Sequence, residues 1–453
     1  MRTKTFGSSR REFLCAAASL IAAPAAFSAP PSPPIKPEDV KFLEDCAHRS
    51  FGYFWDHWNP HTGLVKDRAG VDGSPSGQNV ASIAATGFGL SAMCIAASRA
   101  WVTREQARQH VLTTLRFLWG HAFHDHGWYL HFMDADTGQS RLSSEISSID
   151  TALLLAGVLA VQGYFSNDRE IRGLARDIYE RVDFAWMLNG SKILCHGVKQ
   201  DSGFLNARWQ TYSEASILYL LAIGSPRHSI PVDSWYAWLR PEVRFDSWTF
   251  VSGGALFTHQ YSHAWIDFRH LRDGDPSFLD YFQNSQIATY AHRDFCISLS
   301  SKYSDYGPNM WGMTVSDGPL GYVDWGGTTT MHNSVNGTLV PCAAAGSLMF
   351  TPEICLPALR EMFNQYGDRI YRRYGFADAF NPNWKDKKFW VDHDVVGIDV
   401  GITLLSIENL LTGDVWRYFM RNAYIQNAME KVGFRISTPG NGIPQVRTGA
   451  SRA

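Results

Sequence analysis

Three carboxylates in this sequence precede or begin apolar stretches with helical periodicity, and their placement suggests acid–base chemistry. Glu145 lies in SSEISSID (143–150), Glu214 is the second residue of SEASILYLLAI (213–223) and Asp399 lies in GIDVG (397–401). For any one of them, helix capping is an equally good explanation, because acidic residues in a first turn interact favourably with the helix dipole. If all three meet at one site, they supply what glycoside hydrolysis requires. One carboxyl group protonates the leaving oxygen, and another activates water or attacks the anomeric carbon.

The distribution of aromatic residues favours carbohydrate as the ligand. Phe, Trp and Tyr make up 13% of the chain, which contains 16 Trp. Core packing explains most of them. However, Trp311 precedes Gly312, and Trp325 lies in the polar, glycine-rich segment DWGG. Aromatic rings in such segments are well suited to stack on the apolar faces of sugar rings.

Two kinds of predicted helix alternate along the chain. One kind is apolar on all sides and nearly uncharged, which indicates a helix buried on all sides. The other kind is amphipathic and follows a buried helix after a short connection. The predicted inner helices are 80–98, 146–162, 213–223, 257–271, 339–350 and 400–411. The predicted outer helices are 103–119, 168–186, 231–239, 276–297, 352–366 and 413–430, with a further helix at 37–58.

This alternation predicts an all-α fold, an (α/α)6 toroid of six inner and six outer helices. An open helical solenoid is the alternative. The pairs share no repeat motif, and the inner helices are too apolar for one exposed face, so the closed toroid is favoured. The long connections that lead from an outer helix into the next inner one would cluster at one mouth, where functional loops belong. They are 120–144, 196–212, 302–337 and 368–397.

The N-terminus has the pattern of an export signal. SRREFL (9–14) opens a weakly apolar run that ends in small residues, which is typical of a twin-arginine signal peptide covering residues 1–29. We expect a Pro-rich spacer at 30–36, a single catalytic domain at 37–430 and a flexible C-terminal tail at 431–453. The mature protein is therefore expected in the periplasm or outside the cell.

Charge and cysteine content exclude several other classes of protein. Removal of residues 1–29 would change the formal net charge from −2 to −5, and an acidic chain without basic clusters argues against nucleic acid as a partner. No later stretch has the ~20 continuous apolar residues of a membrane span. The remaining six cysteines permit disulfides in an oxidising compartment, but folding before export favours buried free thiols.

Several motifs in order resemble a known family. They are FGYFW (51–55), NPHTGLVKDR (59–68), SIAATGFGL (82–90), EISSIDTALL (145–154), THQYSHAWID (258–267), YGFADAFNP (374–382) and IEN (407–409). Together they resemble the glucoamylase-like domain of glycoside hydrolase family 144 from about residue 37 to 425. The resemblance implies an (α/α)6 barrel and a metal-independent, inverting β-1,2-glucanase. It also implies that Glu214 is the general acid, that Asp399 is on the base side and that Glu145 is a further pocket acid.

The sequence departs from the expected glycine-rich pattern at 325–336 (WGGTTTMHNSVN). This segment is expected at the pocket mouth, so the departure leaves chain-length preference and endo or exo action open.

Ten further side chains are predicted substrate contacts, and about half of them are expected to touch sugar. They are Arg208, Trp209, Tyr212, His259, Tyr261, His263, Trp265, Trp311, Asp317 and Trp325. His259 and His263 lie four residues apart and could bind a metal. No Glu follows His259 as in His-Glu-x-x-His, so sugar hydrogen bonding or packing is favoured. Ser147 and Asp150 fit a capping box, so Asp150 is interpreted as a cap.

The sequence thus predicts an inverting glycoside hydrolase that cleaves β-1,2-glucan into sophoro-oligosaccharides. No metal or cofactor is expected, the expected partner is β-glucan, and a monomer is expected. Alternatives are an exo-acting β-1,2-gluco-oligosaccharide hydrolase, a glucan transferase, a polysaccharide lyase or a non-catalytic sugar-binding protein on the same barrel.

Overall fold

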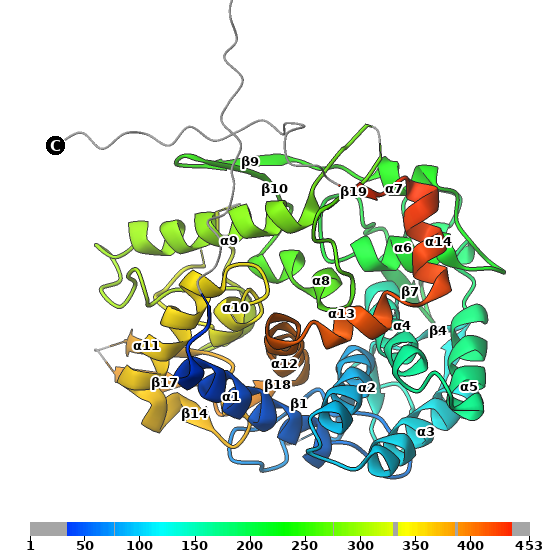
Figure 1. The fold of residues 1–453 in the computed structure, drawn as a ribbon, viewed down its shortest axis with the longest axis horizontal. Coiled ribbons are helices and arrows are strands. Elements are labelled where there is room, and N and C mark those ends of the chain that lie inside the picture. Colours follow the sequence, from blue (N-terminus) through cyan, green and yellow to red (C-terminus); the bar gives the residue numbers. More distant parts are fainter. Residues whose placement is uncertain (1–33, 77, 275, 329–333, 386–387, 437–453) are drawn as a thin grey trace, which may run out of the picture.

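The computed structural model describes residues 34–436, apart from 77, 275, 329–333 and 386–387, and forms a ring of helices around a second, inner ring (Figure 1). The predicted signal peptide (1–29), residues 30–33 of the predicted spacer and residues 437–453 of the predicted tail lie outside the described residues. In the part of the chain that is described, no helix is both long and apolar enough to cross a membrane. The predicted helical toroid is confirmed.

The inner ring consists of apolar helices, as the sequence predicted. Within the described residues these are α2 Ile83–Ser98, α4 Ser148–Tyr164, α6 Ser216–Gly224, α8 Tyr261–Trp265 with the preceding 3-10 turn Leu256–His259, α10 Pro341–Ala345 and α12 Gly397–Leu411. Two of them are shorter than predicted. The segment at 257–271 is helical only to Trp265, and the segment at 339–350 has a single α-helical stretch followed by turns.

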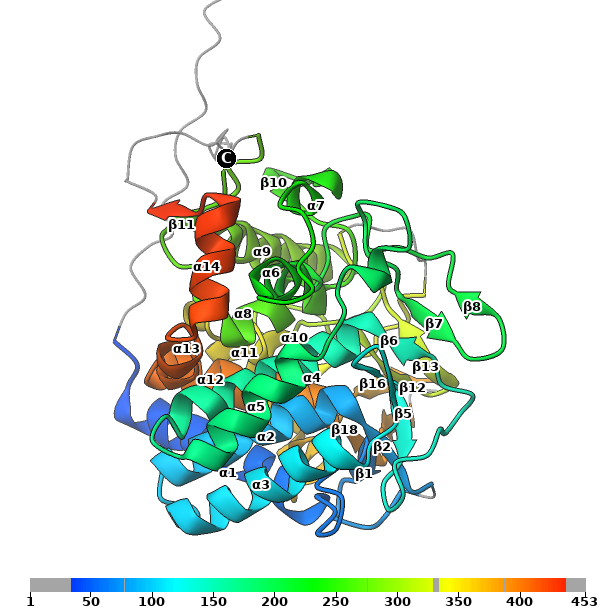
Figure 2. The same cartoon turned by 90° about the vertical axis from the view of Figure 1, so that its right-hand side faces the viewer.

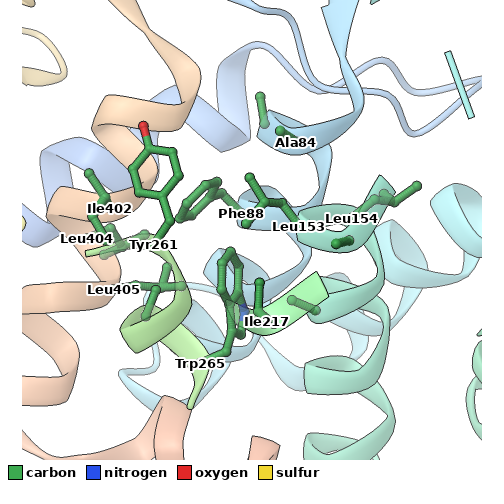
Figure 3. Close-up of a cluster of buried hydrophobic side chains, with 14 of the residues drawn as sticks. Ala84, Phe88, Leu153, Leu154, Ile217, Tyr261, Trp265, Ile402, Leu404 and Leu405 are labelled. Atoms are coloured by element: carbon green, nitrogen blue, oxygen red, sulfur yellow. The ribbon is translucent and has the colours of Figure 1, made fainter. Parts of the chain in front are cut away.

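Apolar side chains from five inner helices fill the centre of the ring (Figure 3). The Phe88 ring of α2 lies 4.7 Å from the Trp265 ring of α8. Close packing also requires small residues where α2 and α4 cross, since a Cβ on Gly157 would lie 2.1 Å from the Gly87 carbonyl oxygen. The described residues at the centre of the ring therefore form a packed core.

Amphipathic helices form the outer layer. Those described are α1 Pro37–Asp56, α3 Arg104–Gly120, α5 Arg169–Glu180, α7 Asp233–Ala237, α9 Tyr281–Ser298, α11 Pro352–Ile370, α13 Asp414–Phe419 and α14 Ala423–Val432. Four of these helices, α3, α5, α9 and α14, begin with a side-chain cap. For example, Thr103 and Gln106 form a reciprocal capping box at the start of α3.

The single outer helix predicted at 413–430 is wrong. The segment divides into α13, which packs against α4 and α8, and α14, which packs on α6. Figure 2 shows α13 on the side of the ring opposite the strands. The Asn422 side chain caps α14 by accepting a hydrogen bond from the Tyr424 backbone N–H at 3.0 Å, and so favours a new helix start at the break. In the outer layer, α1 packs beside α12.

Most of the short strands gather on one side of the ring, where the inner helices begin (Figure 2). The antiparallel pairs are β1 Arg68–Gly70 with β18 Asp394–Val396, β2 Val80–Ser82 with β5 Phe132–Asp134, β3 His124–Asp125 with β4 Trp128–Tyr129, β12 Val315–Gly318 with β13 Gly321–Asp324, and β16 Phe380–Trp384 with β17 Lys388–Val391. A three-stranded sheet joins β6 Ile146–Ser147, β7 Gly197–Lys199 and β8 Gly203–Phe204. Many of these strands lie in the long connections that the sequence assigned to one mouth.

Three further pairs lie elsewhere: β9 Glu242–Phe245 with β10 Trp248–Val251, β14 Tyr371–Arg372 with β15 Gly375–Phe376, and β11 Leu271–Arg272 with β19 Arg435–Ile436. The last pair carries the ordered domain beyond residue 430, so residues 431–436 belong to the domain and not to a flexible tail. The six cysteines that follow the predicted signal peptide are buried free thiols, which confirms the favoured interpretation.

Candidate active site

The three acidic residues singled out in the sequence lie at the mouth, each at the start of an inner helix or just before it. Glu145 precedes β6, which leads directly into α4. Glu214 lies in the turn before α6, and Asp399 is in the first turn of α12. The toroid therefore brings together three acids that are separated by more than 250 residues of sequence.

Glu214 is a buried carboxyl group. Burial raises its pKa to about 7, and the charge of Asp150 adds to this shift. Its backbone carbonyl is held by the Ser262 hydroxyl, which donates to it at 2.6 Å and so ties the turn before α6 to α8. A carboxyl group that retains its proton near neutral pH is suited to general acid catalysis.

Asp399 is also buried, but it has donors that favour its ionised form. The Tyr261 hydroxyl donates to its Oδ1 at 3.3 Å. Burial raises the pKa of Asp399 to about 6, while hydrogen bonds from Asp378, Cys342 and Tyr261 act in the opposite direction. Burial raises the pKa of the Tyr261 hydroxyl well above its usual range, and the charges of Asp399 and Glu214 raise it further. This hydroxyl is at the end of the ring that faces away from Trp265 in Figure 3.

Asp378 connects Asp399 to the β12–β13 hairpin. Its Oδ2 accepts a hydrogen bond from the Asp317 backbone N–H at 2.8 Å. Burial and the charge of Asp399 raise the pKa of Asp378 well above its usual range. The Asp317 carboxylate is paired with Arg68 on β1, so a cation faces this group of acids.

Glu145 belongs to a second polar group on the rim. His131 Nδ1 lies 3.1 Å from Glu145 Oε1, and His131 Nε2 lies 3.5 Å from Asp150 Oδ1. Burial alone would lower the pKa of His131, but the charges of both acids and the hydrogen bond to Glu145 outweigh burial and raise it to about 9. The hydrogen bond from His131 lowers the pKa of Glu145. This geometry gives Glu145 an ionised, orienting role and makes it a poor proton donor.

The predicted cap is present at Asp150. The Ser147 hydroxyl accepts a hydrogen bond from the Asp150 backbone N–H and donates to the Asp150 side chain. The same carboxylate also faces His131, so it contributes to the rim in addition to capping α4.

Three of the ten predicted substrate contacts lie at the mouth; Trp209 and Asp317 are half-buried there, and Tyr261 is buried beside Asp399. Trp209 is half-buried, stacks on His196 with ring centroids 3.9 Å apart, and donates its Nε1–H to the Ser148 hydroxyl at the start of α4. Tyr261 faces Asp399, as described above. Asp317 is half-buried on β12.

Three others are wrong as direct contacts because they lie in the core. Trp265 is fully buried and donates its Nε1–H to the Ser91 hydroxyl. Trp311 is likewise fully buried. His263 is packed among Phe268, Phe282 and Phe350, and burial lowers its pKa well below the usual range.

The remaining four support the mouth and do not line it. Tyr212 and His259 are buried and joined by a hydrogen bond of 3.2 Å. Trp325 is buried and donates to the Ser316 hydroxyl. The Arg208 guanidinium donates to backbone carbonyls, including those of Leu188 and Ile193. In each case the polar atoms are used to hold connections that lead into inner helices.

Sequence reasoning missed three residues that the fold adds to the site: Arg68, His131 and Asp378. The fold also adds Asp392, which the sequence indicated as a solvated loop residue with a weaker chance of ligand contact. Burial and the charge of Asp317 raise the pKa of Asp392 to about 7. Arg68 and Asp378 stand inside motifs that were singled out as stretches, NPHTGLVKDR and YGFADAF. The motifs marked these two segments as related to a known family, but nothing in them identified Arg68 or Asp378 as a site residue.

Two groups of three residues have possible metal-ligand atoms within 4.8 Å of one another: His131, Glu145 and Asp150, and Asp317, Asp378 and Asp392. His131, with its raised pKa, is protonated at neutral pH and offers no lone pair to a metal. In the second group Asp317 is paired with Arg68, and Asp378 accepts a backbone N–H. Protons and ion pairs therefore account for both arrangements.

Chemically, the mouth combines a protonated acid with an ionisable one. Between the pKa of Asp399, about 6, and that of Glu214, about 7, the dominant form has Asp399 ionised and Glu214 protonated. This is the pairing that an acid–base hydrolysis of a glycosidic bond uses.

Comparisons with known proteins agree with this site. The Glycoamylase family profile matches residues 206–423, a range that includes Glu214 and Asp399. An exo β-1,2-glucooligosaccharide sophorohydrolase (non-reducing end) of Parabacteroides distasonis is 26% identical over an alignment 434 residues long, which covers 87% of this chain and 58% of that protein. The chain thus spans somewhat more than half the length of this relative.

Solved structures share the fold. The endo-β-1,2-glucanase from Chitinophaga pinensis, in complex with sophorotriose and glucose, superposes with a TM-score of 0.81 at 27% identity, over 88% of this chain and 98% of that chain. A β-1,2-glucanase from Parabacteroides distasonis superposes with a TM-score of 0.78 at 25% identity, over 88% of this chain and 60% of that chain. In its toroid, its rim acids and these comparisons, the chain is similar to glucoamylase-like proteins that include enzymes acting on β-1,2-glucan, which is consistent with the resemblance of its motifs to glycoside hydrolase family 144.

Proposed function

We propose that this protein is an inverting glycoside hydrolase that cleaves β-1,2-glucan internally and releases sophoro-oligosaccharides. The observation that carries the proposal is the pair of buried acids at one mouth, Glu214 with a pKa of about 7 and Asp399 with a pKa of about 6. The similarity to enzymes that act on β-1,2-glucan supports the choice of substrate.

In the proposed reaction Glu214 donates its proton to the glycosidic oxygen as the bond to the anomeric carbon breaks. Asp399 accepts a proton from the attacking water, either directly or through a substrate hydroxyl. Inversion needs room for this water between the two carboxyl groups, ~6.5–9.5 Å in most inverting enzymes. Tyr261 orients Asp399 through its hydroxyl.

We assign Glu145 and Trp209 to substrate binding at the mouth. Glu145 is held ionised by His131 and is half-exposed, so its carboxylate is available to accept hydrogen bonds from sugar hydroxyls. Trp209 offers an aromatic face fixed by Ser148, which suits stacking on a glucosyl ring. Both residues therefore position the chain, and Glu214 and Asp399 perform the proton transfers.

A second candidate is exo action from a chain end. The similarity to an exo-acting sophorohydrolase favours it, at 26% identity against 27% for the endo-acting glucanase. The products distinguish the two modes. A ladder of oligosaccharides early in the reaction indicates internal cleavage, and a single disaccharide indicates removal of sophorose from an end.

We also propose that the enzyme works in the periplasm or outside the cell. The support is the twin-arginine pattern at 9–14. Fusion of residues 1–29 to a reporter that is active only after export tests this. Loss of export on replacing Arg10 and Arg11 with Lys is expected, and unchanged export would contradict a twin-arginine route.

The central experiment incubates the purified mature protein with linear β-1,2-glucan and, separately, with β-1,3-, β-1,4- and β-1,6-glucans. We expect sophoro-oligosaccharides from the β-1,2 polymer alone and loss of cleavage in Glu214→Gln. The matched control is Glu242→Gln, which changes an exposed glutamate on β9 and should retain full activity. Cleavage of another linkage, or full activity of Glu214→Gln, would contradict the proposal.

A further inference from the structure

Asp378 and Asp399 form a buried carboxyl pair in which two oxygen atoms lack a donor. Asp378 is 4% exposed and Asp399 is 5% exposed. One oxygen of each is satisfied, since Asp378 Oδ2 accepts from the Asp317 backbone N–H at 2.8 Å and Asp399 Oδ1 accepts from Tyr261 at 3.3 Å. Asp378 Oδ1 and Asp399 Oδ2 are buried and have no hydrogen-bond partner among the described residues.

A proton shared by the two carboxyl groups satisfies both remaining oxygens. The side chains lie within hydrogen-bonding distance of each other, and two carboxylates this close in a buried site cannot both stay ionised. Asp399 has Tyr261 as a donor, which favours its charged form. Asp378 lies nearer to a second acid, Asp392, which disfavours a charge on it. The proton therefore belongs on Asp378.

We propose that Asp378 is a positioning residue of the reaction, a carboxylic acid that keeps its proton and donates it in a hydrogen bond to Asp399. This inference rests on the proposed function, which assigns Asp399 to the base side. The hydrogen bond adds Asp378, before β16, to the donors that orient the Asp399 carboxylate, Tyr261 on α8 and Cys342 on α10. It leaves Asp399 charged although the carboxylate is buried, and so lets it accept a proton from water.

Other charged and titratable groups face the pair and bear on any pH dependence. From β12 and β13 these are Asp317 and Tyr322, from β1 and the residue before it Arg68 and Asp67, from the β17–β18 connection and β18 Asp392 and Asp394, and from α10 Cys342. The positive charge of Arg68 offsets the negative charge of Asp317, with which it forms a salt bridge. The surroundings of the pair are thus acidic, which makes a neutral Asp378 electrostatically favourable.

Two substitutions test whether Asp378 acts as a hydrogen-bond donor or as a charged carboxylate. In Asp378→Asn the amide oxygen can accept from the Asp317 N–H, and the amide nitrogen can donate to Asp399. Asp378→Ala removes both hydrogen bonds. We expect the Asn variant to keep kcat within about threefold of the wild-type value, and the Ala variant to lose about tenfold to hundredfold in kcat with little change in KM. The acidic limb of the kcat profile should move to higher pH in the Ala variant only.

The control is Asp233→Asn, which changes an exposed aspartate paired with Lys192 on the outer surface and should leave both kcat and the pH profile unchanged. Equal damage in the Asn and Ala variants would overturn the proposal, because it would show that Asp378 acts as a charged carboxylate. Wild-type kinetics in both variants would overturn it as well.

A spectroscopic measurement tests the proton without relying on activity or on the Ala variant folding. At pH 8 the infrared spectrum of the wild type should contain a carboxylic acid C=O band that Asp378→Asn lacks. If no such band is lost, the pair is bridged by water or a cation instead, and the proposal fails. Chelator treatment provides a second check, since loss of activity that added Ca²⁺ restores would place a cation among Asp317, Asp378 and Asp392.

The two failures are distinguishable. If the wild type cleaves no β-1,2-glucan, the proposed function fails while the infrared band still decides the protonation of Asp378. If the wild type is active and the band is absent, the proposed function stands and only the role of Asp378 is wrong.

Discussion

The hydroxyl group of Tyr261 donates a hydrogen bond to Asp399 Oδ1 across 3.3 Å, and this contact joins the first residue of α8 to the first turn of α12. These residues are 138 positions apart in the sequence. Because the hydrogen bond stabilises the charged form of a buried carboxylate, it helps to set the pH at which the proposed base becomes available.

The first prediction concerns this contact. Tyr261→Phe removes the donor with little change in volume, so the pKa of Asp399 should rise above its present value of about 6. We expect about a tenfold loss of kcat near neutral pH and an acidic limb shifted to higher pH. Tyr179→Phe is the matched control, because it removes a buried hydroxyl that donates to Leu221 O between α5 and α6, away from the mouth. If the acidic limb of the pH profile does not shift in Tyr261→Phe, Tyr261 does not set the pKa of the catalytic Asp399.

The second prediction is the pH dependence of the wild-type enzyme. Activity should rise as Asp399 loses its proton near pH 6 and fall as Glu214 loses its proton near pH 7, so the profile of kcat/KM is bell-shaped and narrow. Initial rates on β-1,2-glucan across pH 4 to 9 (~half-unit steps) measure it. A profile that stays flat above pH 8 would show that Glu214 is not the proton donor.

The third prediction concerns stability. Burial raises the pKa of Glu214 in the folded protein to about 7, above its ordinary value of 4.5, so folding disfavours the ionised form. Stability contributed by this group is complete below pH 4.5 and is lost as the pH rises through 7. Glu214→Gln should therefore be more stable than the wild type at pH 8 by on the order of 3 kcal/mol, with little difference at pH 4.5.

Urea denaturation at the two pH values measures this difference in the free energy of unfolding. Glu242→Gln on the exposed face of β9 serves as the control and should show no pH-dependent change relative to the wild type. Equal stability of Glu214→Gln and the wild type at pH 8 would mean that the Glu214 carboxylate is not desolvated.

The fourth prediction separates core tryptophans from substrate contacts. Trp265→Phe removes the hydrogen bond to Ser91 and leaves a cavity in the centre of the toroid. It should lower the free energy of unfolding by about 2–3 kcal/mol without changing KM at a temperature where the variant is folded. Trp209→Ala should instead raise KM several-fold by removing the stacking face at the mouth. A larger KM effect in Trp265→Phe would reverse the two assignments.

Much of the architecture could be predicted from local patterns. The apolar composition of segments such as 80–98 and the amphipathic spacing of 103–119 each depend on neighbours within one helix, so the alternation of inner and outer helices is readable along the chain. The same locality placed Glu145, Glu214 and Asp399 at the starts of inner helices, and the closed ring then required them to share one mouth.

The structure alone decided which aromatic side chains reach that mouth. Trp265 and Trp209 both lie near predicted functional motifs, yet Trp265 packs on Phe88 and Trp209 lies half-buried at the start of α4. Burial of a side chain is set by helices distant in sequence, so no local pattern distinguishes the two residues. The division of 413–430 into α13 and α14 has a similar origin, because contacts with α4, α6 and α8 hold the two halves apart.

By itself, then, the sequence determined the class of fold and the positions of the three rim acids, because helical periodicity and apolar composition are properties of short segments. Only the tertiary structure placed Asp378 against Asp399 and Arg68 against Asp317. These four side chains come from four separate segments of the chain, and the proton and charge distribution of the site depends on distances between them that exist only once the ring has closed.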